Sequence, residues 1–96
     1  MIAIVDGGST KCDWVILEND GTEVLKTETV GFNPNITKPE LIAIELEKNQ
    51  ALTKFCDYLE NIFFYGSGCG TPENRLIVER EIQKVFTNAN IQVKED

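Results

Sequence analysis

The sequence predicts an α/β domain with one mixed sheet, in which three antiparallel strands are followed by parallel strands. Residues 2–30 hold three short apolar or alternating segments separated by glycine-containing turns. Two amphipathic helical segments then alternate with two further short apolar segments. The resulting order is β-β-β-α-β-α-β, and helical crossovers place the last two strands parallel to the first.

The first three strands are predicted from apolar runs and turn residues. Residues 2–5 are continuously apolar, which is typical of a strand buried on both faces. Residues 13–18 form the second strand, with Trp14 expected in the core. Asn19-Asp20-Gly21 predicts a hairpin, because Asp-Gly readily adopts positive φ. Residues 23–30 alternate polar and apolar side chains, as a half-solvated third strand does.

The first helical segment is predicted to start near Lys38 and to continue, with an interruption near Asn49, as far as Tyr58. Thr37 is the expected N-cap, because Pro39 follows in the first turn and an acidic residue stands at the capping-box spacing.

The second half of the chain repeats the pattern of strand, turn and helix. Residues 62–65 predict a short buried strand that ends in the Gly-Ser-Gly-Cys-Gly run at 66–70. Thr71 is the expected N-cap of the second helix, with Pro72 at its first position. The last strand begins at residues 91–93. The apolar face of the second helix is predicted to comprise Leu76, Val78, Ile82, Val85 and Phe86.

Composition narrows the classes of partner. A length of 96 residues corresponds to one small domain or to part of a larger one. The chain has 16 acidic and 9 basic residues, a net charge of −7, which argues against nucleic acids and membrane surfaces as partners. No apolar run approaches the roughly 20 residues of a membrane span. The N-terminus has no basic region followed by an apolar stretch, so a cytoplasmic location is expected.

Cysteine and histidine usage limits the chemistry. The three cysteines are unevenly spaced, without a Cys-x-x-Cys pair, and histidine is absent. This pattern argues against zinc and iron–sulfur sites and fits reduced thiols. Without histidine, any acid–base chemistry falls to a carboxylate.

The run Asp-Gly-Gly-Ser-Thr-Lys at residues 6–11 is the main candidate for chemistry. Its glycines let the backbone approach a ligand, and successive N–H groups can form an anion-binding nest beside the Asp6 carboxylate. An anion, a hard cation and hydroxyl donors together indicate a nucleotide phosphate with Mg²⁺. The run is not a Walker A loop, because a strand and not a helix follows. The alternative is a turn that only links two strands.

The run Asp-Gly-Gly-Ser-Thr-Lys-x-Asp-Trp resembles the first phosphate motif of the acetate and sugar kinase, Hsp70 and actin superfamily. It is most similar to the BadF/BadG/BcrA/BcrD ATPase family, which includes N-acetylglucosamine kinases. Three later segments extend the resemblance along the chain: Gly31-Phe32-Asn33-Pro34, Phe64-Tyr65-Gly66-Ser67-Gly68-Cys69 and Val93-Lys94-Glu95-Asp96. The resemblance implies a ribonuclease H-like (actin-like ATPase) domain. Residues 1–96 would be the N-terminal part of one lobe, and the second lobe would be absent.

The resemblance also implies roles for individual residues. Asp6 would hold Mg²⁺, and Asp96 would accept the proton of the attacking hydroxyl. Contacts with the β- and γ-phosphates of ATP would come from Gly7, Gly8, Ser9 and Thr10, with Lys11 adding charge. The sugar site would be formed by Asn33, Gly66, Ser67 and Gly68.

Each of these residues also has a plain structural interpretation. Lys11 could be a solvated cation, and Asn33 could only initiate an Asn-Pro turn. The glycines at 66–70 could only permit a sharp strand-to-helix turn. Asp96 could be a solvated terminal carboxylate.

The function implied by the resemblance is ATP-dependent phosphorylation of a sugar hydroxyl, with N-acetylglucosamine as the expected substrate of the full-length protein. Residues 1–96 alone are expected to be inactive, because the adenine site would lie in the second lobe. Two alternatives stay open: an ATPase that activates a 2-hydroxyacyl-CoA dehydratase, and a non-catalytic nucleotide-binding module. An apolar edge exposed by truncation would also permit a homodimer.

Overall fold

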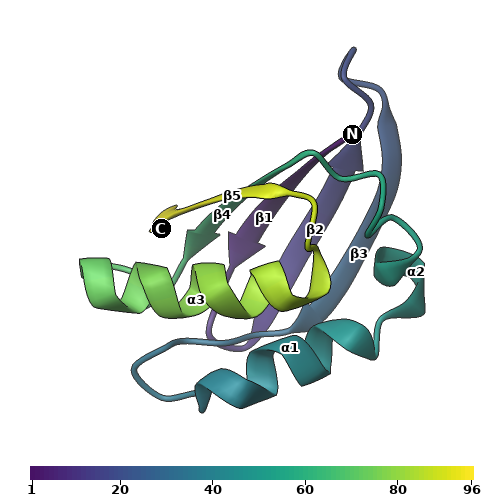
Figure 1. Ribbon diagram of the computed structural model, residues 1–96. Coiled ribbons are helices and arrows are strands. Elements are labelled where there is room, and N and C mark those ends of the chain that lie inside the picture. Colours follow the sequence, from purple (N-terminus) through teal and green to yellow (C-terminus); the bar gives the residue numbers. More distant parts are fainter.

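Five strands form one mixed sheet in the order β3-β2-β1-β4-β5 (Figure 1). The computed structural model describes all 96 residues, Met1–Asp96. The elements are β1 (Ile2–Gly7), β2 (Lys11–Leu17), β3 (Glu23–Val30), α1 (Pro39–Glu47), α2 (Gln50–Thr53), β4 (Asn61–Gly66), α3 (Pro72–Val85) and β5 (Asn90–Glu95). Strands β1, β2 and β3 pair antiparallel, whereas β4 and β5 run parallel to β1, which confirms the predicted strand directions.

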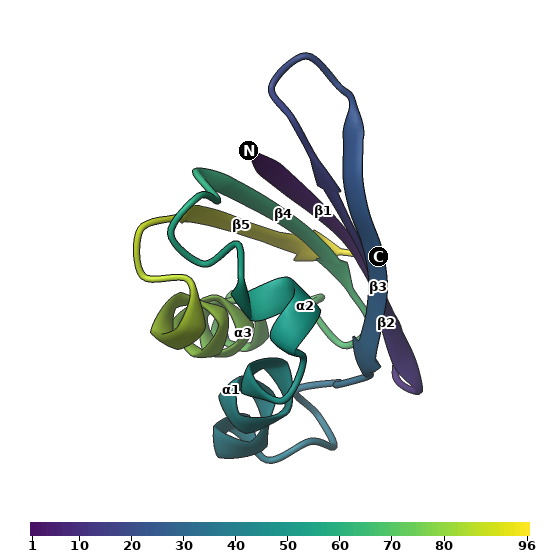
Figure 2. The same ribbon diagram turned by 90° about the vertical axis from the view of Figure 1, so that its right-hand side faces the viewer.

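All three helices lie on the same side of the sheet (Figure 2). Ala3 and Val5 of β1 point to that side and are fully buried, whereas Ile4 between them is 43% exposed. The prediction that residues 2–5 are buried on both faces is therefore wrong, because no helix covers the other face. None of the helices combines the length and apolar character that a membrane crossing requires.

Trp14 connects the sheet to the end of α3. Its ring is buried, as predicted, and lies 5.8 Å from the ring of Phe86, measured between centroids. The indole Nε1 donates a hydrogen bond of 3.0 Å to Thr29 Oγ1, so this buried polar atom has a partner.

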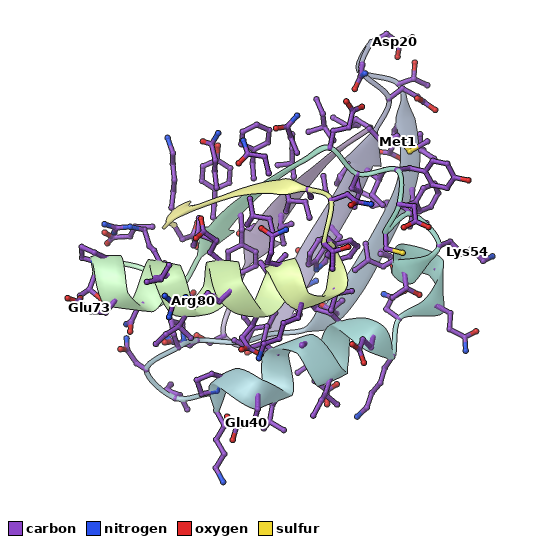
Figure 3. The ribbon with its side chains drawn as sticks, viewed as in Figure 1. Met1, Asp20, Glu40, Lys54, Glu73 and Arg80 are labelled. Atoms are coloured by element: carbon purple, nitrogen blue, oxygen red, sulfur yellow. The ribbon has the colours of Figure 1, made fainter.

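The turn between β2 and β3 is a hairpin, as predicted, and Gly21 has a φ of 94°. Asp20 Oδ1 accepts a 2.9 Å hydrogen bond from Thr22 N, which stabilises the tip. Figure 3 shows Asp20 at one end of the molecule and Glu73, in the first turn of α3, at the other end.

The start of α1 differs from the prediction. Lys38 is the N-cap residue, with extended backbone and no side-chain capping bond, and Pro39 follows in the first turn as predicted. Thr37 is not the cap, because its Oγ1 accepts a 3.1 Å hydrogen bond from Asn33 N. The hydroxyl therefore stabilises the preceding loop and not the helix.

The predicted interruption at Asn49 is confirmed, but the helix beyond it is shorter than predicted. Asn49 Oδ1 caps α2 by accepting from Leu52 N, and its Nδ2 donates to Thr27 Oγ1 and Glu28 O on β3. Helix α2 ends at Thr53, and residues 54–58 continue as turns.

Helix α3 starts as predicted, with Thr71 Oγ1 accepting from Asn74 N at 3.2 Å. The predicted apolar face is wrong at Leu76, which is 41% exposed. Glu81 is buried instead, 6% exposed, and its carboxylate pairs with Lys84.

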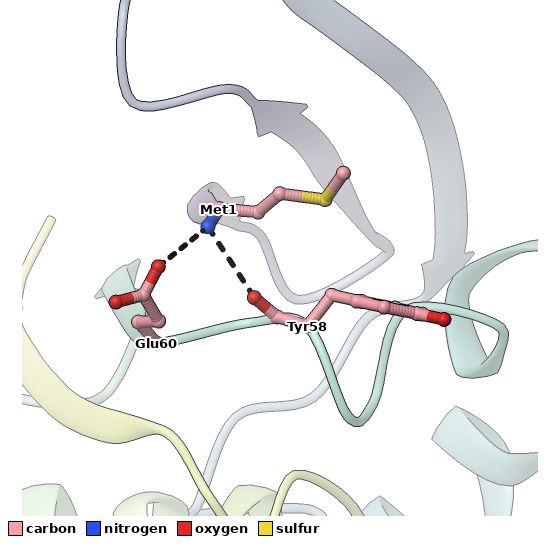
Figure 4. A network of polar contacts seen from close by, with 3 residues as sticks. All are labelled: Met1, Tyr58 and Glu60. Carbon is pink, nitrogen blue, oxygen red and sulfur yellow. Dashed lines mark hydrogen bonds and ion pairs between the residues drawn. The ribbon is translucent and has the colours of Figure 1, made fainter.

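The N-terminal amino group of Met1 is bonded to the segment before β4 (Figure 4). It donates hydrogen bonds of 3.0 Å to Glu60 Oε1 and 3.3 Å to Tyr58 O. The hydrogen bond and the positive charge of the amino group lower the pKa of the Glu60 carboxyl. The backbone N–H of Glu60 donates to Met1 O at 2.9 Å, so the parallel pairing of β1 and β4 begins at Met1.

The cysteines should differ in reactivity. Burial raises the pKa of the Cys12 thiol from 9.0 to about 11, and Cys12 and Cys69 are buried whereas Cys56 is half-buried. Near neutral pH we expect a thiol reagent to modify Cys56 first and Cys12 only on unfolding, as peptide mapping by mass spectrometry would show. Equal rates for Cys12 and Cys56 in the folded protein, compared with a denatured control, would contradict this packing.

The same pKa shift predicts a loss of stability at high pH. Because the folded-state pKa of Cys12 is raised, the folded state favours the protonated thiol. This contribution is fully present below pH 9.0, the unfolded value, and is lost as the pH rises through about 11. We expect the free energies of unfolding of the wild type and of Cys12→Ala, measured in urea across this pH range, to converge at high pH.

Candidate functional site

The predicted site residues lie where β1, β4 and β5 end. Ser67 N donates to Gly7 O at 2.8 Å, and Asp96 N donates to Gly66 O at 3.2 Å. These bonds continue the parallel pairing beyond the strands and bring the ends of three strands to one edge of the sheet. In open α/β sheets, ligands bind at the carboxyl ends of parallel strands.

The turn between β1 and β2 keeps two backbone donors free. Gly8 N donates to Lys11 O at 2.9 Å and closes the turn, so this N–H group is not available to a ligand. The N–H groups of Ser9 and Thr10 have no acceptor within the protein. Of the N–H groups that the sequence proposes for an anion-binding nest, those of Ser9 and Thr10 are therefore unpaired in the turn.

A hollow of about 240 Å³ lies beside this turn. Its lining residues are Asp6, Gly8, Ser9, Thr10, Lys11 and Asp13. No cluster of three metal-ligating side chains is present. A cation at Asp6 would therefore have one or two carboxylates, with water and phosphate oxygens completing its shell, which is the coordination that Mg²⁺ prefers.

Lys11 is paired with carboxylates on the uncovered face of the sheet. Its Nζ lies 3.3 Å from Glu28 Oε1 and 3.7 Å from Asp13 Oδ1. The hydrogen bond with Glu28, followed by the charges of Asp13 and Glu28, raises the pKa of the Lys11 ammonium. These side chains are largely exposed, so solvent screens the pairs and leaves Lys11 free to exchange partners.

Packing in the core requires glycine at Gly7 and Gly66. These residues are neighbours on β1 and β4. A Cβ on either glycine would lie 2.3 Å from an atom of the Phe64 ring. That ring is stacked on Phe32, with centroids 5.2 Å apart, which places the loop after β3 against the end of β4. Packing therefore gives a second reason for glycine at Gly7, beside the access of a ligand to its backbone that the sequence predicts.

Three separate segments meet at Asn33. Its Nδ2 donates to Ser9 Oγ at 3.4 Å, and its Oδ1 accepts from Asn35 N at 2.9 Å. Gly68 lies against the same carboxamide: its φ is +76°, and a Cβ there would be 2.0 Å from Asn33 Oδ1. The structure thus brings together Ser9, Asn33 and Gly68, which are far apart in the sequence.

Two carboxylates end β5, and their environments differ. The Glu95 side chain lies near Gly70, where a Cβ would be 3.4 Å from Glu95 Oε2. Asp96 follows the strand and is bonded to Gly66 through its backbone. Sequence reasoning missed Glu28, Asn35 and Asn74. Only Asn74 has a local signal, because it is the third residue after the Thr71 N-cap.

A larger apolar hollow, of about 470 Å³, lies beside α1. It is lined by residues of the 30–38 segment and of α1. None of the predicted site residues borders it.

The fold is similar to that of a kinase-like solved structure. The crystal structure of a protein described as a "putative N-acetylglucosamine kinase" from Porphyromonas gingivalis aligns with a TM-score of 0.89 and 29% sequence identity. The alignment covers 100% of this chain and 34% of that one, so this chain spans about a third of the neighbour's length. No family model matches the chain, and no curated protein matches it.

Gly31 should not tolerate a side chain. A Cβ there would lie 2.5 Å from Gly8 O and Lys11 N, which are backbone atoms of the turn. We expect Gly31→Ala to lower the free energy of unfolding by about 1–3 kcal/mol in urea titrations, as overpacked sites do.

Gly70→Ala is the matched control. Its Cβ would meet only the Glu95 side chain, at 3.4 Å. We expect a change in the free energy of unfolding within about 0.5 kcal/mol. Equal stabilities of the two variants would contradict the close contact between Gly31 and the turn.

Proposed function

We propose that this chain belongs to an ATP-dependent sugar kinase of the BadF/BadG/BcrA/BcrD type. It would form the first part of the N-terminal lobe in a ribonuclease H-like, actin-like fold. The observation that carries the proposal is the convergence of Ser9, Asn33 and Gly68 beside a turn with two free N–H donors. The likeness to a kinase-like structure supports it. The expected substrate is N-acetylglucosamine.

The turn would hold the phosphates of ATP. The free N–H groups of Ser9 and Thr10 and the hydroxyls of these residues would donate to phosphate oxygens. Lys11 would exchange Glu28 for a phosphate, since its exposed ion pairs are weak. Asp6 would bind Mg²⁺ through its carboxylate, and the metal would neutralise charge on the phosphates. Phosphoryl transfer depends mainly on such positioning and charge neutralisation.

The sugar would lie between the turn and the loops at 33–37 and 66–70. Asn33 can both donate and accept, as a sugar hydroxyl requires. Asp96 would take the proton of the attacking sugar hydroxyl. The oxygen of that hydroxyl would form a bond to the γ-phosphorus, and the bond from the γ-phosphorus to ADP would break. The hydrogen bond from Asp96 N to Gly66 O, at the end of β4, supports this role.

The proposal is tested by assaying the complete gene product that contains residues 1–96 with ATP, Mg²⁺ and N-acetylglucosamine. We expect transfer of the γ-phosphoryl group to the sugar and none by residues 1–96 alone. ATP hydrolysis that no sugar stimulates would favour the dehydratase-activating ATPase. Nucleotide binding without turnover would favour the non-catalytic module.

Asp96→Asn should lower kcat by about 10²–10⁴-fold, because the carboxamide cannot accept the proton. Glu95→Gln is the matched control, because it removes the neighbouring carboxylate, which lies near Gly70. We expect Glu95→Gln to keep near wild-type kcat in the same steady-state assay. Equal losses in both variants would contradict the role of Asp96.

Asp6→Asn should raise the Mg²⁺ concentration needed for half-maximal activity, because a neutral amide binds a hard cation more weakly than a carboxylate. The measurement is a Mg²⁺ titration of turnover at saturating ATP, with circular dichroism showing that the fold is kept. An unchanged Mg²⁺ requirement would exclude Asp6 as the metal ligand.

A further inference from the structure

Asn74 bridges the two loops that hold the candidate sugar-binding residues. Its Nδ2 donates to Asn35 Oδ1 at 2.8 Å, in the loop after β3, and to Gly68 O at 2.8 Å, in the loop after β4. Gly68 O can only accept, so the Asn74 atom that faces it is the amide nitrogen. Its two hydrogens satisfy both acceptors. We call this contact the Asn74 bridge.

The bridge acts on Asn33 from two sides. On one side, Asn35 N donates to Asn33 Oδ1 at 2.9 Å, so holding Asn35 holds the Asn33 carboxamide. On the other side, Gly68 packs directly against that carboxamide, and even a Cβ on Gly68 would overlap it. The remaining polar contact of the Asn33 side chain, the 3.4 Å bond from its Nδ2 to Ser9 Oγ, is long. The two bonds of the bridge, at 2.8 Å each, are shorter than this one.

The anchor of the bridge is a rigid element. Asn74 lies in the first turn of α3, a helix of 14 residues that packs on α1 and β5. Its backbone N–H is bonded to the Thr71 side chain, which caps the helix. A loop tied to such an element loses less conformational entropy when it binds a ligand, which improves affinity.

We propose that Asn74 is a positioning residue for the sugar, and this inference rests on the proposed sugar kinase function. Asn74 fixes the loop at 33–37 against the loop at 66–70 and so presents the Asn33 carboxamide to the sugar hydroxyls. It does not touch the phosphate turn. Its loss should therefore weaken sugar binding and leave ATP binding unchanged.

The test compares two Asn→Asp substitutions in the complete gene product. Asn74→Asp removes the donor and places a carboxylate opposite two acceptor oxygens. The substitution should not destabilise α3 itself, because an acidic residue is favourable in the first turn of a helix. Asn35→Asp keeps an acceptor oxygen for the Asn74 amide. Both substitutions add the same charge, so they separate the loss of the donor from the effect of charge.

The first readout is amide hydrogen exchange at Ile36 and Thr37, whose N–H groups donate to Asn33 O at 2.8 and 2.7 Å. We expect exchange to rise about tenfold in Asn74→Asp and to stay near wild type in Asn35→Asp. Asn35→Leu, which removes the acceptor at an exposed position, should match Asn74→Asp and serves if Asn74→Asp does not fold. Equal exchange in Asn35→Leu and the wild type would overturn the bridge, whatever the activity of the protein.

The second readout is steady-state kinetics. We expect KM for N-acetylglucosamine to rise about tenfold in Asn74→Asp, with KM for ATP and kcat unchanged, and no change in Asn35→Asp. An unchanged KM for the sugar in an active enzyme would overturn the positioning role and leave the kinase function standing. A wild type that phosphorylates no sugar would overturn the proposed function, and the sugar-positioning role with it. The exchange measurement would still decide whether the bridge holds the loops.

Discussion

The position of the Phe64 ring is the constraint on which the rest of the candidate site depends. The ring occupies the space where side chains of Gly7 and Gly66 would lie, so only glycine fits at the paired ends of β1 and β4. Its stacking on Phe32 attaches the loop after β3 to the same place. Because protein interiors are close-packed, this arrangement leaves the three segments little freedom to separate. One aromatic pair thus determines where the turn between β1 and β2, the 33–37 loop and the 66–70 loop meet.

Polar contacts at the surface hold together the same segments that the Phe64–Phe32 pair holds in the core. Gly31 fits against the backbone of the turn, and Asn33 reaches Ser9. Asn35 and Asn74 join the 33–37 loop to the 66–70 loop. Asp13 and Glu28 lie on the uncovered face beside the turn, where Lys11 offsets part of their charge. The Mg²⁺ that we propose at Asp6 would offset more of it.

The sequence was sufficient for the strands, their directions and the hairpin at Gly21, because these depend on local apolar patterns and turn residues. It was misleading at Thr37, which stands at a capping position but bonds to Asn33 in the preceding loop. It predicted the interruption at Asn49 but not the bonds that tie this residue to β3. It also could not indicate that one face of the sheet lacks helices, so Ile4 was expected to be buried. The candidate residues of the turn came from the sequence, whereas Glu28, Asn35 and Asn74 required the fold. The partners of Glu28 and Asn35 lie 17 and 39 residues away, beyond the reach of a local pattern, whereas Asn74 has a local signal at the start of α3.

The central claim is that the turn between β1 and β2 is a phosphate site that faces a sugar site around Asn33. It is tested most directly by a crystal structure of the complete gene product with ADP, Mg²⁺ and N-acetylglucosamine. We expect the β-phosphate within about 2.7–3.2 Å of the N–H groups of Ser9 and Thr10, Mg²⁺ near Asp6, and a sugar hydroxyl bonded to Asn33. A nucleotide bound away from this turn, or a sugar that does not contact the 33–37 loop, would contradict the account.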